Sequence, residues 1–315
     1  MSAQHSDTGH PRPQLRTLVT ALVATAGLCL AAFLLYRIFK TYSLRQIADA
    51  AASIPAIRLA AAGAFAAGSY FCLTLFDMLA TRHVGHRLPY PKIALASFCS
   101  LSIGHNIGFA ALSSGAIRYR FYSGYGLSLE EVAKVILFCA VTVGLGLATL
   151  GSAALLLRPS LAVKVIGIDR SAVIWAGIAC ALVPVAYLAA AATVRGKLRV
   201  FRWSFEMPSL RIALAQIGIG AANFACVAAC LHQLLAATGG AAYLEVASAY
   251  VIANVATLLA HAPGGLGVIE AVVSTLLPHA KVIGGLVAFR LTYYIVPLLL
   301  GGPLFALAEL RRRRE

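Results

Sequence analysis

One stretch of the chain places the polar residues expected of a binding site in an apolar setting. Residues 113–125, SSGAIRYRFYSGY, carry Arg118 and Arg120. The run before them, SFCSLSIGHNIGFAAL, carries His105 and Asn106. Each unsatisfied polar group in hydrocarbon costs several kcal/mol. These side chains are therefore expected to face protein or a water-filled cavity, and we interpret the stretch as part of a functional centre.

The chemistry that these residues favour is the binding of an anion. Ser114 and Gly115 precede Arg118, whose planar guanidinium can hold a phosphate or a carboxylate through two parallel hydrogen bonds. A second interrupted stretch, HAPGGLGVIE, opens a helix whose N–H groups and dipole also favour an anion. We therefore predict a pocket for an anionic lipid headgroup. The second stretch contributes Pro263, Gly264, Gly265, Gly267 and Glu270.

Two charged residues fall inside late apolar runs, Glu270 and Arg290. Charges at membrane depth are rare and normally paired, so we expect Glu270 to pair with Arg290 or with Arg118. The alternative to a functional role is a buried pair that only fixes helix packing. Asp77 closes an earlier apolar run, and we interpret it as a solvated helix end or a partner of Arg82.

The two interrupted stretches have a similar layout. Asn106 precedes Gly115 at almost the same spacing as Asn254 precedes Gly264. Paired broken segments in two halves of a chain are typical of a transporter site built on an internal repeat. The likeness is short, and coincidence is the alternative.

Composition sets the class of protein. Hydrophobic residues make up 60% of the 315 residues and charged residues only 12%, against roughly a quarter in soluble domains. The sequence therefore predicts an all-α, polytopic transmembrane helical bundle.

The seven cysteines lie in apolar runs without metal-ligand spacing, so no metal or other cofactor is expected. The net charge of +15 comes from basic residues at the ends of apolar runs, which favours membrane phospholipids and not nucleic acid as the partner.

The apolar runs predict seven to eight spans, with two re-entrant or broken helical segments. Residues 1–16 are expected to form a disordered cytoplasmic arm, residues 17–310 a single transmembrane domain and residues 311–315 a basic cytoplasmic tail. Re-entry is predicted for residues 92–112, and a break for residues 261–270. The expected spans are 17–36, 56–80, 132–157, 171–193, 212–237, 244–260 and 282–307.

The distribution of Lys and Arg predicts the orientation. If residues 92–112 enter and leave on the cytoplasmic face, most basic residues fall inside, including the basic loop 195–211 and the RRRR terminus. We therefore expect both termini to lie in the cytoplasm and the protein to lie in the cell (inner) membrane.

Two blocks resemble a known family. SSGAIRYRFYSGYGLSLEEVAKVILF and APGGLGVIEAVVSTLLP are similar to the hallmark blocks of the transmembrane region of lysylphosphatidylglycerol synthases, which is shared with YbhN-like integral membrane proteins. The resemblance implies a bundle with re-entrant helices and, in the bifunctional members, a flippase region that moves an aminoacylated phospholipid. It also implies roles for Arg118 and Arg120 in the first block and for Pro263, Gly264, Gly265, Gly267 and Glu270 in the second. The chain ends at RRRRE without the soluble aminoacyl transfer domain, so we do not expect synthase activity from it alone.

The leading hypothesis is a phospholipid flippase or translocase. A second hypothesis is a non-transporting membrane partner of a lipid-synthesising enzyme, recruited through the basic loop 195–211. A third is a headgroup transferase that uses His105 or His261 as an acid or base. Against the third, the sequence offers no nucleophile with a neighbouring base and no GxxxxGK phosphate loop.

Overall fold

A computed structural model describes most of the chain after its first fifty residues. The described residues are 52, 54–107, 110–160, 163, 167–194, 197–200, 203–237, 241–260, 265–277 and 282–312. The predicted arm 1–16, the predicted span 17–36, His261, Pro263 and Gly264 lie outside them.

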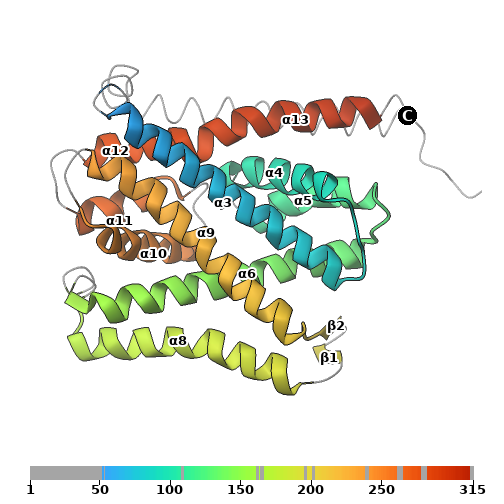
Figure 1. Ribbon diagram of the computed structural model, residues 1–315, viewed down its shortest axis with the longest axis horizontal. Helices are drawn as coiled ribbons and strands as arrows, with labels where there is room; N and C mark the ends of the chain where they lie inside the picture. The colour runs from blue at the N-terminus through green and yellow to red at the C-terminus, as the bar shows by residue number, and fades with distance from the viewer. Residues whose placement is uncertain are drawn as a thin grey trace, which may run out of the picture.

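The described part of the chain is a bundle of long apolar helices (Figure 1). Six of its helical segments are long and apolar enough to cross a membrane, which confirms the predicted all-α, polytopic class. Each lies within a few residues of a predicted span. They are α3 (Ala56–His83), α6 (Leu129–Leu157), α8 (Arg170–Thr193), α9 (Leu210–Ala236), α10 (Tyr243–Ala260) and a continuous run built from α12 (Val282–Phe289), the π-helix η2 (Arg290–Ile295) and α13 (Val296–Arg312).

The antiparallel pair α3 and α9 defines the two ends of the bundle. Near one end, Arg58 Nη1 donates to Gln233 Oε1 at 2.8 Å. In the middle, Ser69 Oγ donates to Asn223 Oδ1 at 2.7 Å. The other end also holds the start of α6 and the last turn of α13 (Figure 1). These ends are called the Ala56 end and the Arg312 end below.

Two helical hairpins enter the bundle from opposite ends (Figure 1). The first joins α4 (Tyr90–Ile107) to α5 (Ala110–Ser123), with Lys92 over the Tyr125 ring at its base at the Arg312 end. The second joins α10 to the nine-residue α11 (Val268–Leu276), with its base at the Ala56 end. The return helices α5 and α11 are about 21 and 14 Å long, too short for a hydrocarbon core of about 30 Å. Both predicted interruptions are therefore present as re-entrant hairpins.

The first hairpin extends further than the sequence predicts. Re-entry is predicted to end at Leu112, but the return helix α5 continues to Ser123 and carries Arg118 and Arg120 on a regular helix. The reason is that apolar residues recur at helical spacing in this stretch, although it also carries many polar residues. Ile117 and Phe121, four residues apart, are both buried.

The start of α6 is capped by its own side chains. Ser128 Oγ accepts from Glu131 N at 3.3 Å, and Glu131 Oε2 accepts from Ser128 N at 2.7 Å. This capping box satisfies two backbone donors that a helix start leaves unpaired.

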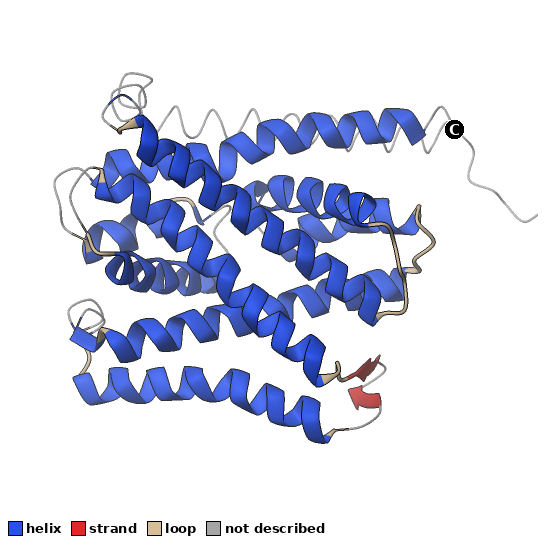
Figure 2. Ribbon diagram, in the orientation of Figure 1, coloured by secondary structure: helices blue, strands red, loops and turns tan. Residues whose placement is uncertain are grey.

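The basic connection between α8 and α9 contains two short antiparallel strands, β1 (Lys197–Val200) and β2 (Trp203–Glu206) (Figure 2). The sequence analysis describes this segment only as a loop. Its KLRV and WSFE segments alternate polar and apolar residues with the period of a strand, which is a weak signal over only four residues.

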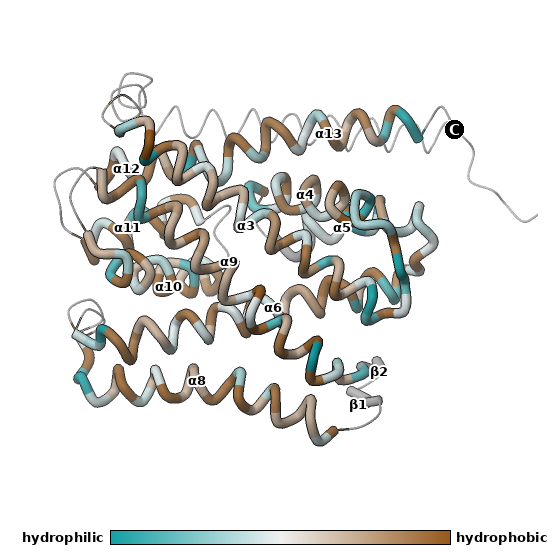
Figure 3. Tube along the Cα trace, viewed as in Figure 1, coloured by the Kyte–Doolittle hydropathy of each residue, from teal (hydrophilic) through white to brown (hydrophobic). Residues whose placement is uncertain are grey.

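Hydropathy agrees with a membrane setting. Figure 3 shows hydrophobic residues along the length of the long helices, and hydrophilic residues at the end of α13 and around the connection from α3 to α4. The flank formed by α8 is the most open, because Trp175, Leu182 and Val185 are each more than half exposed. Such a surface suits lipid chains and not water.

Helices α6 and α9 cross with their backbones in close contact. A Cβ atom at Gly146 would overlap the backbone carbonyl of Gly220, and one at Gly220 would come within 2.8 Å of the Thr142 carbonyl oxygen. Small residues let membrane helices approach closely enough for backbone contact. We expect the two backbones to separate if either glycine gains a side chain.

Gly146→Ala is therefore expected to destabilise the protein by about 1–3 kcal/mol, because the added methyl group meets backbone that cannot move alone. The measurement is the thermal unfolding midpoint in detergent. Gly144→Ala is the matched control, since a Cβ at Gly144 meets nothing within 4 Å. Equal midpoints for the two variants would contradict the prediction.

Candidate functional site

The first hairpin is fastened to the bundle by a buried ion pair between α5 and α3. Arg118 Nε donates to Asp77 Oδ1 at 2.9 Å, and Arg118 Nη2 donates to Asp77 Oδ2 at 3.0 Å. The side chains are 4% and 0% exposed. Ser114 Oγ accepts a third hydrogen bond from Arg118 Nη1 at 3.0 Å. The Cys139 thiol of α6 lies 3.7 Å from Asp77 Oδ1, so three helices meet at this pair.

The interpretation of Asp77 as a solvated or Arg82-paired helix end is wrong. Helix α3 runs six residues beyond it to His83, which places the carboxylate inside the bundle. The polar residues after Asp77 suggest a helix end in the sequence, but they continue the helix. The sequence did contain one indication. A carboxylate within an apolar run is costly without a counter-charge, so Asp77 was expected to need a basic partner.

The second hairpin is fastened by a buried ion pair between α11 and η2. Arg290 Nε donates to Glu270 Oε1 at 2.7 Å, and Arg290 Nη2 donates to Glu270 Oε2 at 3.0 Å. The exposed fractions are 4% for Arg290 and 16% for Glu270. The predicted pairing of Glu270 with Arg290 is confirmed, and the alternative partner Arg118 is held by Asp77 instead.

The turn before α11 shows why glycines occur there. Gly265 and Gly267 have φ values of 63° and 81°, which favour glycine. The Gly265 carbonyl accepts from Arg290 Nη2 at 2.8 Å, and the Gly267 N–H donates to Glu270 Oε2 at 2.9 Å. The anion at this helix start is thus the chain's own carboxylate. Across the pair, the guanidinium of Arg290 lies 4.7 Å from the centre of the Tyr294 ring.

The tip of the first hairpin contacts the π-helix that carries Arg290. Asn106 Nδ2 donates to the Tyr294 carbonyl at 3.2 Å, and the Tyr70 hydroxyl donates to the Tyr293 carbonyl at 3.3 Å. The Tyr293 hydroxyl lies 2.8 Å from Ser69 Oγ. A π-helix changes the pairing of backbone carbonyls, and such segments are frequent at functional sites. Through η2, the two hairpins share one polar region.

His105 lies in the same region, between aromatic rings. Its ring centre is 6.2 Å from that of Tyr70 and 6.5 Å from that of Tyr293. Its Nδ1 is buried and has no hydrogen-bond partner among the described residues, so ring packing alone does not explain a histidine at this depth.

Arg120 has a different environment from Arg118. It forms a two-point ion pair with Glu309 of α13 at the Arg312 end, and its side chain is 49% exposed. Arg312 donates to the carbonyls of Arg120 and Phe121 at 2.7 and 3.0 Å. These contacts fasten the last turn of α13 to α5.

The predicted site residues therefore fall into three groups. The first hairpin holds His105, Asn106, Ser114, Gly115 and Arg118, and the second region holds Gly265, Gly267, Glu270 and Arg290. Arg120 is separate, at the Arg312 end. Their role in headgroup binding stays a prediction. Three partners of these residues were not predicted from the sequence: Asp77 of Arg118, Glu309 of Arg120 and Tyr293 of His105.

Comparison with known proteins identifies the family. No family model matches the chain. The uncharacterized protein slr0712 of Synechocystis sp. is 32% identical over 271 residues, 82% of this chain and 81% of that protein. The inner membrane protein YbhN of Escherichia coli is 26% identical over 256 residues, 78% of each chain. The chain belongs to the family of YbhN-like membrane proteins. This YbhN-like protein is thus a multi-pass membrane protein, as its apolar helices indicate.

The buried pairs of the YbhN-like protein differ from its surface pairs in what their loss should cost. Asp77→Asn or Arg118→Gln leaves one buried charge without a counter-charge, and we expect a loss of about 3–5 kcal/mol of stability. The double variant should recover most of that loss. The measurement is a double-mutant cycle of unfolding in detergent.

Glu130→Gln is the matched control, because the Glu130–Lys134 pair lies on the surface and the Glu130 side chain is 61% exposed. Its removal is expected to cost less than about 1 kcal/mol. A single variant at Asp77 or Arg118 that is no less stable than this control would refute the structural importance of the buried pair.

Proposed function

We propose that this YbhN-like protein is a translocase that moves a phospholipid with an anionic or aminoacylated headgroup between the leaflets of the membrane. One observation carries the proposal. Each of two re-entrant hairpins, entering from opposite ends, is joined to a long helical segment by a two-point arginine–carboxylate pair whose arginine is buried. Ionisable groups at this depth are expensive and typical of substrate pathways. Broken helices that meet near the middle of a bundle are typical of transporter sites.

The geometry of the pairs supports an exchange of partners. A guanidinium holds a phosphate with the same two-point geometry that it uses for a carboxylate. A lipid phosphate can therefore replace Glu270 or Asp77 without leaving the arginine unpaired. The Glu270–Arg290 pair is the more accessible, since Glu270 is 16% exposed and Asp77 is 0% exposed. We infer that an entering headgroup meets Arg290 before Arg118.

The distribution of charge supports an orientation. The Arg312 end gathers more basic residues than the Ala56 end, and the excess of Lys and Arg normally faces the cytoplasm. On this basis both termini lie in the cytoplasm, the first hairpin enters from the cytoplasmic side and the second from the opposite side. The described basic residues at the Arg312 end are Arg82, Arg87, Lys92, Arg120, Lys134, Lys197, Arg199, Arg211, Arg311 and Arg312, against Arg58, Arg158 and Arg170 at the other.

The test is leaflet movement of labelled anionic and aminoacylated phospholipids in liposomes that contain the purified protein. The informative variant is Glu270→Gln/Arg290→Gln, which removes both charges together and leaves no unpaired charge in the bundle. We expect its transport rate to fall about 10- to 100-fold, equivalent to a lost charged hydrogen-bond contact of about 1.5–3 kcal/mol.

Arg170→Gln is the control, because Arg170 is an exposed residue at the start of α8. Wild-type transport by the double variant would remove the second ion pair from the mechanism. If the folded wild type moves no lipid, with or without a proton gradient, the translocase proposal fails. Retention of a lipid-synthesising enzyme through the basic loop 195–211 would then favour the partner function.

A further inference from the structure

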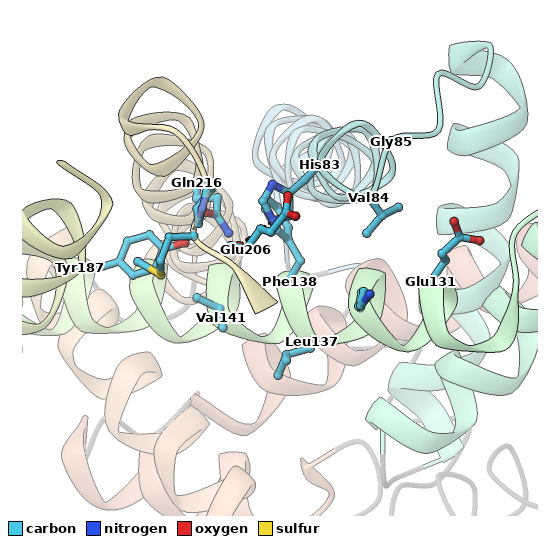
Figure 4. A pocket seen from close by; sticks show the side chains of 13 residues that line it. His83, Val84, Gly85, Glu131, Leu137, Phe138, Val141, Tyr187, Glu206 and Gln216 are labelled. Atoms are coloured by element: carbon cyan, nitrogen blue, oxygen red, sulfur yellow. Dashed lines mark hydrogen bonds between the residues drawn. The ribbon is translucent and has the colours of Figure 1, made fainter. Parts of the chain in front are cut away.

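A cavity of about 400 Å³ lies at the Arg312 end, apart from both buried ion pairs. It follows one face of α6 and is covered by the end of α3 and by the segment from β2 to α9 (Figure 4). Figure 4 shows Glu131 near one end of the cavity and Tyr187 and Gln216 near the other. Its volume is in the range of pockets that hold small organic ligands, about 300–1,000 Å³.

The charged residues of the cavity are unusual for this chain. The whole sequence has 26 basic and 11 acidic residues, yet the cavity is lined by two carboxylates, Glu131 and Glu206, and one lysine, Lys134. A third carboxylate, Glu130, lies 2.7 Å from the Lys134 ammonium. The side chains of Glu131 and Lys134 are 31% and 28% exposed, so an entering ligand can reach them. The ligand shares Glu131 with His86, whose Nε2 lies 2.9 Å from Glu131 Oε1, and shares Lys134 with Glu130. Glu131, Lys134 and Glu206 form the charged part of the cavity, called its mouth below. The mouth therefore favours a ligand with a positive group and also offers one cation for a negative group.

The rest of the cavity is apolar. Leu137, Phe138 and Val141 continue the line of α6 below the charged residues, and Met207 and Pro208 lie across from them. The ten-residue step from Glu131 to Val141 corresponds to about 15 Å along the helix. Leu137 is also 42% exposed, which leaves this apolar part open at the flank of the bundle. A charged mouth continuous with a long apolar channel fits an amphipathic ligand.

The far end of the channel is closed by polar contacts. The Tyr187 hydroxyl donates to Gln216 Oε1 at 2.6 Å, and Gln216 Nε2 donates to Thr142 Oγ1 at 2.9 Å. Between the two ends, His83 Nε2 lies 3.0 Å from the backbone oxygen of Glu206 (Figure 4). The polar groups that end the channel are thus already satisfied within the protein. A ligand that only fills the apolar part leaves them undisturbed.

We propose that this cavity binds one molecule of a zwitterionic phospholipid whose headgroup carries a phosphate and a primary amine. The amine contacts the carboxylates of Glu131 and Glu206, the phosphate contacts Lys134, and one acyl chain lies along Leu137 and Val141. A phospholipid without the amine brings only negative charge to two carboxylates, so it binds more weakly. Binding here does not require the protein to move lipid, so the inference goes beyond the proposed function.

The experiment compares two lipids with identical chains, phosphatidylethanolamine and the amine-free phosphatidylglycerol, by native mass spectrometry of the purified full-length protein. A photoactivatable acyl chain on the first lipid maps the contact. We expect at least about tenfold preferential retention of the amine lipid and cross-links on α6 between residues 131 and 141.

Two variants test the apolar channel. Val141→Trp fills it and is expected to reduce retention of phosphatidylethanolamine at least about tenfold. Leu157→Trp is the matched control on the same helix, at a side chain that is 64% exposed, and should retain the lipid as the wild type does. If Val141→Trp fails to fold, Leu137→Trp provides the same obstruction at a partly exposed position.

Two charge variants test the mouth. Glu206→Gln removes one carboxylate and keeps the backbone oxygen that His83 contacts. It should weaken binding of the amine lipid and strengthen binding of the amine-free lipid, which loses a repulsive contact. Lys134→Gln should weaken both. Equal retention of the two lipids by the wild type, cross-links outside the cavity, or full retention by folded Val141→Trp or Leu137→Trp would each overturn the inference. Failure of lipid movement in liposomes would reject the translocase alone.

Discussion

The positions of the two hairpins depend on the free-energy cost of an unpaired charge in a medium without water. Asp77 and Arg118 are almost completely buried, and each is acceptable only because the other is within 3 Å. The same holds for Arg290 with Glu270. Each pair joins a short return helix to a long helix, so electrostatics decides where the hairpins lie. Hydrophobic burial does not hold such elements together inside a membrane, because lipid chains are as apolar as leucine. Polar contacts and close packing of small residues, as at Gly146 and Gly220, remain available.

The π-helix connects these contacts to one another. Arg290 begins η2, and the carbonyls of Tyr293 and Tyr294 accept hydrogen bonds from α3 and α4. A regular α-helix pairs most of its carbonyls within itself, whereas the irregular segment offers them to neighbouring helices. The tip of the first hairpin thus depends on the backbone geometry of the helix that holds the second. This arrangement concentrates the polar groups of both hairpins in a single region of the bundle.

Composition and hydropathy predicted the membrane class and the bounds of the long helices, because those properties follow from local sequence. The Glu270–Arg290 pair was also predictable, since deep charges need partners and few candidates exist. Asp77 was not recognised, because its depth depends on how far α3 continues, and the polar residues after it suggest a helix end. The partnership of Arg120 with Glu309 joins residues distant in the chain, and one sequence carries no signal for it. The hairpin β1–β2 was missed because four-residue strands give almost no periodicity.

The run from α12 through η2 to α13 is one uninterrupted helical rod, from Val282 to Arg312. Near its start Arg290 is bound to the second hairpin, and near its end Glu309 and Arg312 are bound to the return helix of the first. At 1.5 Å per residue, these two attachment points are about 28 Å apart. If either hairpin moves together with this helical run, the run displaces its contacts with the other hairpin. The two membrane faces of the protein are therefore mechanically linked.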